Sequence, residues 1–232
     1  GGTEILSSDM LAREDPALAE RARLRLVATP KARPPDKPEE TSGMVLVAAA
    51  PATGPRGEIL GALYGGILLN RNSAIVDRVC DLVYRDERFA DREVGTVTIF
   101  QNDIRISTNV KTEAGERALG TRVSAEVEEA VLGRGETWRG RAFVVNDWYI
   151  SRYDPIRNHQ GRIVGMLYVG LLERVYTSIR DRVILSFFGI AGAGFIVILL
   201  LTYYEIGRIT RPVGEMVAAT RSIAAGRFDQ EV

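Results

Sequence analysis

The sequence is poor in the residues that build disulfides, metal sites and nucleophilic active sites. Cys80 is its only cysteine, so an intrachain disulfide is excluded and the redox compartment stays open. His159 is its only histidine and lies in a predicted turn, which argues against a histidine-based triad or a metal cluster. A glycine-rich phosphate loop is also missing. We therefore expect no catalytic residue, no metal and no cofactor in these 232 residues.

An excess of charge of either sign is absent as well. Thirty lysine and arginine residues balance thirty acidic ones, and this neutrality implies no nucleic-acid partner. Hydrophobic residues make up 46% of the chain, which is enough for a globular domain with its own core. The chain begins at Gly1 instead of methionine, so we expect it to be part of a longer protein.

One stretch near the C-terminal end contains no charge at all. Residues 183–204 have the sequence VILSFFGIAGAGFIVILLLTYY. As a helix rising about 1.5 Å per residue, this stretch reaches about 33 Å, enough to cross a hydrocarbon core of about 30 Å. The alternative, a buried core helix, usually keeps a polar stripe, which this stretch lacks. We predict a membrane span, and its length and position exclude a secretory signal peptide.

The part of the chain before this stretch contains an internal repeat. A shift of 104 residues places Gly57–Leu69 on Gly161–Glu173, where seven of thirteen positions are identical, and it aligns Pro51 with Pro155 without a gap. Agreement at this density indicates two copies of one module.

Each copy of the repeat predicts a β-hairpin. The first pairs Met44–Ala50 with Ile59–Leu69, and the second pairs Trp148–Tyr153 with Ile163–Leu172. Glycine inside a strand costs stability, so the strand glycines indicate bulges or a close approach of another backbone; they are Gly61, Gly65, Gly66, Gly165 and Gly170.

The second copy predicts a more complete module than the first. Three further elements are predicted before its hairpin. Gly95–Thr108 forms another hairpin, Ala125–Leu132 forms a helix whose glutamates face solvent, and Glu136–Asn146 forms one more strand. A helix beginning near Asn72 or Ser73 connects the copies. Five antiparallel strands with an intervening helix make an α+β module. The proline-rich segment Ala28–Gly43 predicts an exposed loop without a chemical role.

Four segments of this second module resemble the extracytoplasmic double-Cache sensors of bacterial histidine kinases, chemoreceptors and cyclic-di-nucleotide enzymes. They are Val97–Val110, Leu119–Arg122, Gly140–Ile150 and Tyr153–Ile156. With the first module, the resemblance covers about residues 1–174. It implies an α+β fold of two tandem PAS-like Cache modules, although the first lacks its N-terminal helix and first strands. It also implies a small ligand, often an organic acid or amino acid, between the sheet and the segment 109–135.

The residues after the span resemble a HAMP relay. Ile209–Pro212 followed by Val213, Met216 and Val217 is similar to its first helix, and Ala225–Asp229 to its connector. Apolar residues three and four apart also suit a parallel coiled coil. Arginines flank both ends of the span and leave its orientation open. Since HAMP relays are cytoplasmic, the resemblance implies a bacterial inner membrane protein with residues 1–182 outside and 205–232 inside.

These observations predict five consecutive segments. They are a truncated membrane-distal Cache module (1–70), a connecting helix (71–93), a membrane-proximal Cache module (94–174), a signalling helix with the span (175–204) and the first part of a HAMP domain (205–232).

Strand alternation selects the candidate ligand-binding residues. One face of each strand carries Arg105 with Ser107, Arg141 with Phe143, and Tyr149 with Tyr153, so a pocket between these faces has two cations, hydroxyl donors and aromatic walls. Arginine is the natural partner of a carboxylate because its planar fork binds both oxygens. The full set of predicted ligand-binding residues is Arg105, Ser107, Arg122, Arg141, Phe143, Asn146, Tyr149 and Tyr153.

Other roles for these residues stay open at this point. The arginines also suit surface ion pairs, the tyrosines suit a half-buried sheet, and Asn146 with Asp147 suits a turn. Trp138 and Trp148 are assigned to the opposite face of the sheet or to its rim.

The leading hypothesis is a transmembrane sensor. A small carboxylate or amino acid binds the proximal module, and the signal passes through the span into the HAMP helices of a homodimer. The alternative from another class is an ectodomain that binds no ligand and only dimerises or docks a partner protein. A third is a membrane-bound enzyme whose catalytic domain lies beyond Val232, such as a kinase or cyclase.

Overall fold

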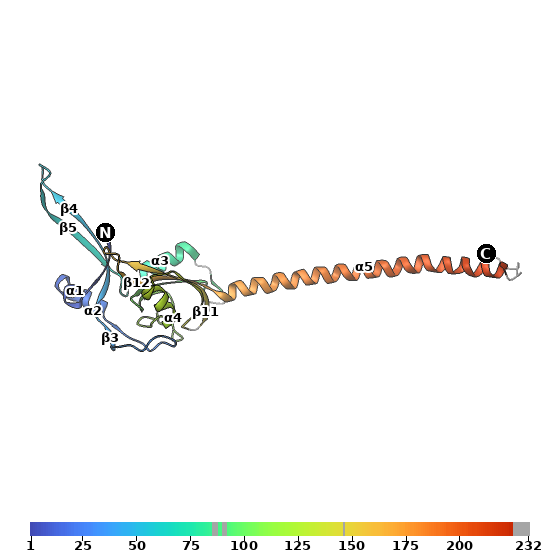
Figure 1. Cartoon of the computed structure of the whole chain (residues 1–232), viewed down its shortest axis with the longest axis horizontal. Coiled ribbons are helices and arrows are strands. Elements are labelled where there is room, and N and C mark those ends of the chain that lie inside the picture. Colours follow the sequence, from blue (N-terminus) through green and yellow to red (C-terminus); the bar gives the residue numbers. More distant parts are fainter. Residues whose placement is uncertain (85–87, 90–91, 146, 225–232) are drawn as a thin grey trace. The chain divides into compact units, whose positions relative to one another are not determined.

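The computed structural model describes residues 1–84, 88–89, 92–145 and 147–224, and the chain divides into two compact units, Gly1–Tyr176 and Thr177–Val232 (Figure 1). The elements of the first unit are β1 (Gly2–Leu6), α1 (Ser8–Glu14), α2 (Pro16–Ala22), β2 (Leu24–Arg25), β3 (Glu39–Glu40), β4 (Gly43–Thr53), β5 (Ile59–Leu68), α3 (Ser73–Tyr84), β6 (Arg88–Phe89), β7 (Arg92–Glu93), β8 (Gly95–Gln101), β9 (Ile104–Thr108), α4 (Ala125–Glu128), the π-helical turn η1 (Glu129–Gly133), β10 (Trp138–Val144), β11 (Asp147–Arg157) and β12 (Ile163–Leu172). One helix, α5 (Glu173–Ala224), begins at the end of the first unit and continues into the second.

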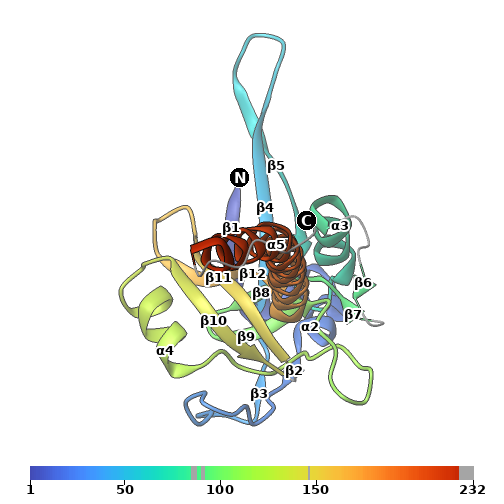
Figure 2. The ribbon, with the colours of Figure 1, turned by 90° about the vertical axis from the view of Figure 1, so that its right-hand side faces the viewer.

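A five-stranded antiparallel sheet with the order β10-β11-β12-β8-β9 forms the centre of the first unit. Helix α3 packs on one face against β8 and β9, and α4 with η1 packs on the other face against β11 and β12 (Figure 2). Neighbouring residues of β8 therefore face different cores, Ile99 the α3 side and Phe100 the α4 side. All seven residues of β8 are buried because both faces of the strand are covered. The predicted module of five strands and one intervening helix is confirmed.

The internal repeat is also a repeat of structure. Each of the nine residue pairs in the β4–β5 hairpin becomes a pair of the β11–β12 hairpin when 104 is added to both numbers. Even the register shift recurs, after Ala52 in the first copy and after Ile156 in the second. Register is set by side-chain pattern and turn geometry, so equal patterns produce equal hairpins. Both predicted hairpins are confirmed.

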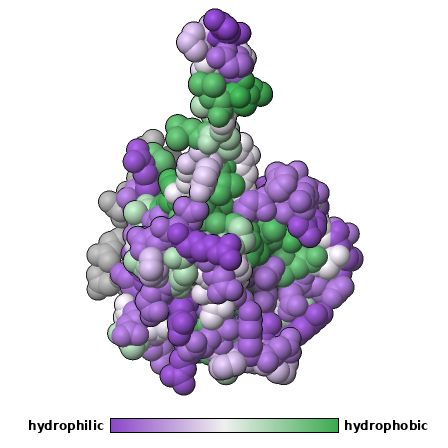
Figure 3. Space-filling model, turned by 90° about the vertical axis from the view of Figure 1, so that its left-hand side faces the viewer, coloured by the Kyte–Doolittle hydropathy of each residue, from purple (hydrophilic) through white to green (hydrophobic). Residues whose placement is uncertain are grey.

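The two copies differ in what surrounds them. The first lies in a three-stranded sheet of order β1-β4-β5, and most of its hairpin projects as an exposed arm (Figures 1 and 3). A Cβ on Gly165 of the second copy would lie 2.0 Å from the Phe100 carbonyl oxygen, which confirms the predicted close approach. At the equivalent Gly61 nothing lies within 4 Å, so no backbone approaches it, but the predicted bulge is present there because the register shifts next to its partner Ala52.

The N-terminal residues contain more structure than the sequence pattern indicated. No element was predicted before residue 44, yet β1, α1 and α2 precede it. Local signals for the helices exist: the Ser7 and Asp15 side chains accept hydrogen bonds from Met10 N and Ala17 N, and Pro16 occupies the first turn of α2. Whether residues 1–70 represent a truncated module stays a prediction.

Helix α5 contains the predicted span. Arg182–Ile206 is long and apolar enough to cross a membrane, and none of its most apolar window is buried within the structure. The predicted continuity of strand, helix and span is confirmed, since β12 ends at Leu172 and α5 begins at Glu173. The helix continues without a break through position 212, so the juxtamembrane helix does not begin anew there. The predicted connector at 225–229 lies outside the described residues.

Candidate functional site

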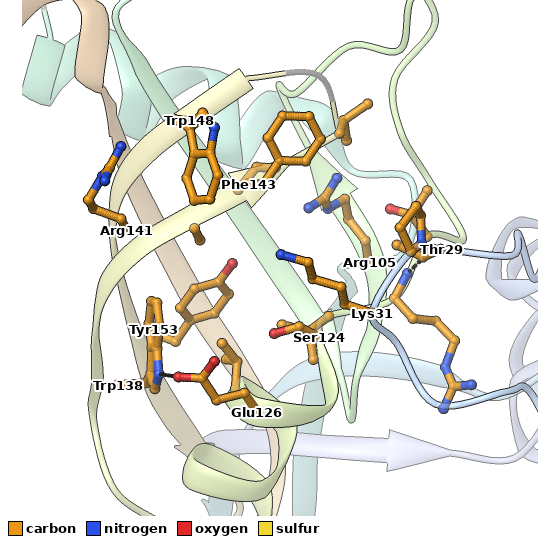
Figure 4. Close-up of a pocket in the computed structure, with 18 residues that line it drawn as sticks. Thr29, Lys31, Arg105, Ser124, Glu126, Trp138, Arg141, Phe143, Trp148 and Tyr153 are labelled. Carbon is orange, nitrogen blue, oxygen red and sulfur yellow. Dashed lines mark hydrogen bonds between the residues drawn. The ribbon is translucent and has the colours of Figure 1, made fainter.

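A cavity of about 360 Å³ opens between the sheet and the segment that covers it (Figure 4). Its wall comes from three parts of the chain that are distant in sequence. They are the proline-rich segment (Thr29, Pro30, Lys31), strand β9 with the residues leading into α4 (Arg105, Thr121, Arg122, Val123, Ser124, Glu126, Val127), and strands β10 and β11 with their connection (Trp138, Arg141, Ala142, Phe143, Val144, Val145, Trp148, Tyr153). A cavity of this size suits a small organic molecule.

Arg105 is the most unusual residue of this cavity. Its side chain is only 4% exposed, and its Nε and Nη1 atoms have no hydrogen-bond partner among the described residues. The guanidinium lies over the Phe100 ring, with 5.3 Å between the ring centroid and the guanidinium carbon. Burial lowers the pKa of the guanidinium, because removal from water disfavours the cation. A buried cation without a partner costs free energy that a bound anion recovers.

Aromatic side chains form the wall next to Arg105. The Tyr153 hydroxyl points into the cavity (Figure 4), and burial raises the pKa of this phenol, so it stays a neutral donor at pH 7. The Trp138 ring packs edge-on against Tyr153 at 5.6 Å between centroids. Its Nε1 donates a hydrogen bond of 3.1 Å to Glu126 Oε1, which ties the wall to the start of α4.

The rim of the cavity carries an arginine that already has partners. Arg141 Nη2 lies 2.9 Å from Glu173 Oε2, and its guanidinium stacks over Trp148 at 5.0 Å from the ring centroid. Phe143 packs edge-on against the same tryptophan and is half exposed. The rim residues therefore shape the opening of the cavity. The charge of Arg141 is already paired with Glu173 at the start of α5.

The proline-rich segment closes the remaining side. Lys31 extends over the cavity from the edge opposite Trp148, with its Nζ 5.9 Å from that ring centroid (Figure 4). This segment was predicted to be an exposed loop without a chemical role. Most of its residues are exposed, three of them line the cavity, and whether they have a chemical role stays untested.

The chain matches the profile of the family described as "Single cache domain 3" over residues 67–183, which is just over half of its length. It belongs to the single-Cache family. No curated protein matches the chain. Among solved structures, the periplasmic domain of Vibrio cholerae LuxQ is similar over 69% of this chain and 60% of that chain, at 16% identity and a TM-score of 0.35. A likeness of that size says nothing about ligand or mechanism.

The family identifies the five-stranded sheet with α3 and α4 as a Cache-type extracytoplasmic sensor domain. Cache domains generally bind small molecules, and the cavity in this one is lined by members of the predicted set. Arg105, Arg122, Arg141, Phe143 and Tyr153 line it together. Their role in ligand binding stays a prediction.

Ser107 and Tyr149 do not line the Cache cavity. The β8–β9 register shifts between Ile99 and Phe100, so β9 holds one extra residue between Arg105 and Ser107. This bulge reverses the alternation of the strand, and Ser107 Oγ donates to Asn72 O on the α3 side at 2.8 Å. Tyr149 is on the expected face but is buried in the core beneath the cavity.

Arg122 and Asn146 also differ from the prediction. Arg122 lines the cavity, but its Nε donates to Asp103 Oδ2 and its Nη1 to Arg33 O, so its guanidinium has a structural role already. Asn146 lies outside the described residues.

The sequence analysis missed Lys31 and Trp138. Trp138 was assigned to the opposite face or the rim, but it pairs with Tyr153 and shares its face of the sheet. Arg141 and Phe143 were predicted to share that face, but they alternate with Ala142 and Val144 on β10 and reach the cavity from its rim. Lys31 was missed because nothing local in a proline-rich loop indicates which distant surface it covers.

Proposed function

We propose that this chain is the sensory part of a transmembrane receptor whose Cache domain binds a small organic anion, a carboxylic acid or an amino acid. The observation that supports this function is Arg105, a buried cation that lines the cavity and whose Nε and Nη1 have no hydrogen-bond partner in the described part of the chain. Cations in folded proteins are almost always paired when buried, so the missing partner is a ligand.

The chemistry of the cavity favours a carboxylate over a neutral ligand. Two charge-assisted hydrogen bonds from Arg105, each contributing about 1.5 to 3 kcal/mol, stabilise the ligand by about 3 to 6 kcal/mol. The Tyr153 hydroxyl adds a donor, and Trp138 with Phe143 supplies apolar surface for the carbon chain. Micromolar affinity, about 8 kcal/mol, lies within reach of this set.

The connection to the membrane supports relay of the signal. Strand β12 passes into α5 at Glu173 without an intervening loop. Arg141 of the cavity rim pairs with Glu173 itself, and Arg174 Nε lies 3.2 Å from Asp147 Oδ1. A ligand that shifts β10 or β11 therefore acts directly on the first turn of α5. We propose that α5 carries this shift through a bacterial inner membrane, with residues 1–182 outside, to a HAMP relay formed by residues 205–232.

A screen of the full chain in detergent micelles tests ligand binding. A carboxylate or amino acid present at 100 times its Kd stabilises the fold by about 2.7 kcal/mol, and we expect the unfolding temperature to rise by about 5 to 10 °C. Calorimetric titration then measures the affinity. A broad panel of organic acids and amino acids without a single hit contradicts the proposed function.

The exposed arm favours a second candidate function, assembly with another copy of this chain. In the second copy of the repeat, the edge of β12 at Gly165–Leu171 pairs with β8, whereas the equivalent edge of β5 at Gly61–Ile67 has no partner strand among the described residues. Leu63 and Tyr64 are 76% and 65% exposed there. Residues 61–67 carry no charge of their own, and Tyr64 donates a hydrogen bond to Glu14 Oε1 of α1 at 2.7 Å. An unblocked edge of this kind can pair with another strand, and β5 of a second copy is an uncharged strand of equal length.

Charges placed on this edge test the assembly. We expect the full chain in detergent to be dimeric and the double variant Leu63→Lys with Ile67→Lys to be monomeric, because like charges repel across paired strands. Sedimentation or light scattering measures the mass. Glu58→Lys, at the tip of the same arm, is the control and leaves the dimer intact. A monomeric unmodified chain, or a dimer that survives the double substitution, contradicts this role.

A further inference from the structure

The proline-rich segment is attached along the wall of the cavity. We call residues 27–33 the strap. It runs beside the segment 120–125 and is joined to it by hydrogen bonds of 2.9 Å from Val27 N to Gly120 O, from Arg122 N to Thr29 Oγ1 and from Ala125 N to Lys31 O. At Gly120 the φ is +74°, and a Cβ would lie 2.1 Å from Arg25 O, so only glycine permits this close approach.

The C-terminal end of the strap is held by charges. Arg33 Nη1 lies 3.2 Å from Glu128 Oε1 and its Nη2 lies 2.9 Å from Glu129 Oε2. Arg122 Nη1 donates to the Arg33 carbonyl at 2.6 Å. Both acidic residues belong to the helical turn that covers the sheet, so the strap and that turn form one connected wall. The position of Lys31 over the cavity is therefore built into the fold.

The backbone of Lys31 is strained. Thr29, Pro30, Lys31 and Ala32 form a turn closed by a hydrogen bond of 3.2 Å from Ala32 N to Thr29 O, and Lys31 has a φ of +66°. Proline followed by a positive φ defines a type II turn, whose third position favours glycine or asparagine. A lysine there costs stability. Strained positions of this kind are frequent at ligand sites, and this one lies at the cavity, unlike Arg71 and Asn102, which also have a positive φ.

The ammonium group of Lys31 has no anionic partner among the described residues. Its one described contact is with the face of Trp148, which orients a cation but does not neutralise it. In Figure 4 the ammonium points into the cavity from the side opposite Trp138 and Glu126, and Arg105 lies deeper in the same cavity. The cavity thus holds two cations without anionic partners among the described residues. They are the buried guanidinium of Arg105 and the ammonium of Lys31 at the opening.

We propose that Lys31 is a specificity-determining residue that binds a second anionic group of the ligand while Arg105 binds the first. This inference rests on the proposed function. It adds that the strap contributes a binding residue and that the preferred ligand carries two anionic groups. Lys31 lies outside the residues 67–183 that match the single-Cache family, so the family match does not assign it a role. The preferred ligand is a dianion short enough for both cations to reach.

Monoacids and diacids with the same number of carbon atoms distinguish the role of Lys31 from that of Arg105. Calorimetry with the full chain in micelles compares succinate with butyrate, and glutarate with valerate, each pair differing by one carboxylate. We expect the diacid of at least one pair to bind about 10 to 100 times more tightly, as one added charge-assisted hydrogen bond implies. In Lys31→Met this preference disappears while the affinity for the monoacid stays unchanged. Lys111→Met, at an exposed lysine away from the cavity, is the control and keeps the preference.

The backbone strain provides a second readout. Lys31→Gly relieves the strained turn, so we expect a higher unfolding temperature without ligand together with a lost preference for diacids. If Lys31 only packs on Trp148, the preference for diacids stays unchanged in Lys31→Gly. Equal affinity of Lys31→Met and the unmodified chain for the diacids overturns this inference but leaves the proposed function intact. Absence of binding by every acid overturns the proposed function itself.

Discussion

Replacement of Arg105 by methionine is expected to abolish binding of the organic anion and at the same time to stabilise the empty protein. Loss of two charge-assisted hydrogen bonds removes about 3 to 6 kcal/mol of binding free energy, which lowers the affinity by at least about 100-fold. Methionine has a similar length but no charge. It removes the penalty of a buried cation whose Nε and Nη1 have no hydrogen-bond partner among the residues that the structure describes, and we expect the unfolding temperature without ligand to rise by several degrees.

Two comparisons make the Arg105 result specific. Arg139→Met changes an exposed arginine on strand β10 that does not line the cavity, and it is expected to leave both affinity and stability unchanged. Arg105→Lys keeps a charge but loses the planar fork, so an intermediate affinity is expected. Calorimetry measures binding and thermal unfolding measures stability. Unchanged affinity in Arg105→Met contradicts the assigned site, and a large loss of stability shows that Arg105 serves the fold.

Two arginines placed near the centre of the apolar stretch are expected to release the protein from the membrane. Each isoleucine-to-arginine change costs about 3 to 4 kcal/mol of insertion free energy, so Ile190→Arg with Ile196→Arg costs about 6 to 8 kcal/mol. Both residues lie within Arg182–Ile206, where the helix is exposed along its length. The measurement is the fraction of the expressed chain that stays in membranes after an alkaline carbonate wash.

A control with the same number of new charges belongs to this experiment. Leu82→Arg with Val83→Arg adds two arginines to exposed positions of α3 in the Cache domain and is expected to leave membrane retention unchanged. Retention of the Ile190 and Ile196 double variant at the level of the unmodified chain contradicts a spanning role for α5.

Local pattern predicted the elements from residue 44 onward better than those before it, where β1, α1 and α2 were missed. Alternation and turn residues predicted the hairpins, and the bounds Ile163 and Leu172 of the last strand agree with the structure. The 104-residue repeat predicted a shared hairpin geometry, and the register of the two hairpins is the same pair by pair. These features depend on residues close together in the chain, which is why composition and period suffice.

The candidate site was predicted only in part. Arg105 was selected by strand alternation and does face the cavity, but Ser107 was selected by the same rule and does not. The difference arises from one extra residue in β9. This bulge cannot be predicted from the residue types in the strand. Arg122 and Arg141 looked equal to Arg105 in the sequence, and only their partners Asp103 and Glu173 show that they are occupied.

Local spacing along the chain was enough to identify an uncharged stretch long enough to span a membrane, a repeated hairpin and an α+β module with arginines on its strands. The three-dimensional contacts were needed to show that Arg105 Nε and Nη1 have no hydrogen-bond partner among the described residues, and that Lys31, 74 positions earlier, lies over the same cavity. Burial and pairing of a side chain depend on contacts between segments that are distant in the sequence. A buried charge destabilises the fold unless a group of opposite charge, from the protein or from a ligand, lies next to it.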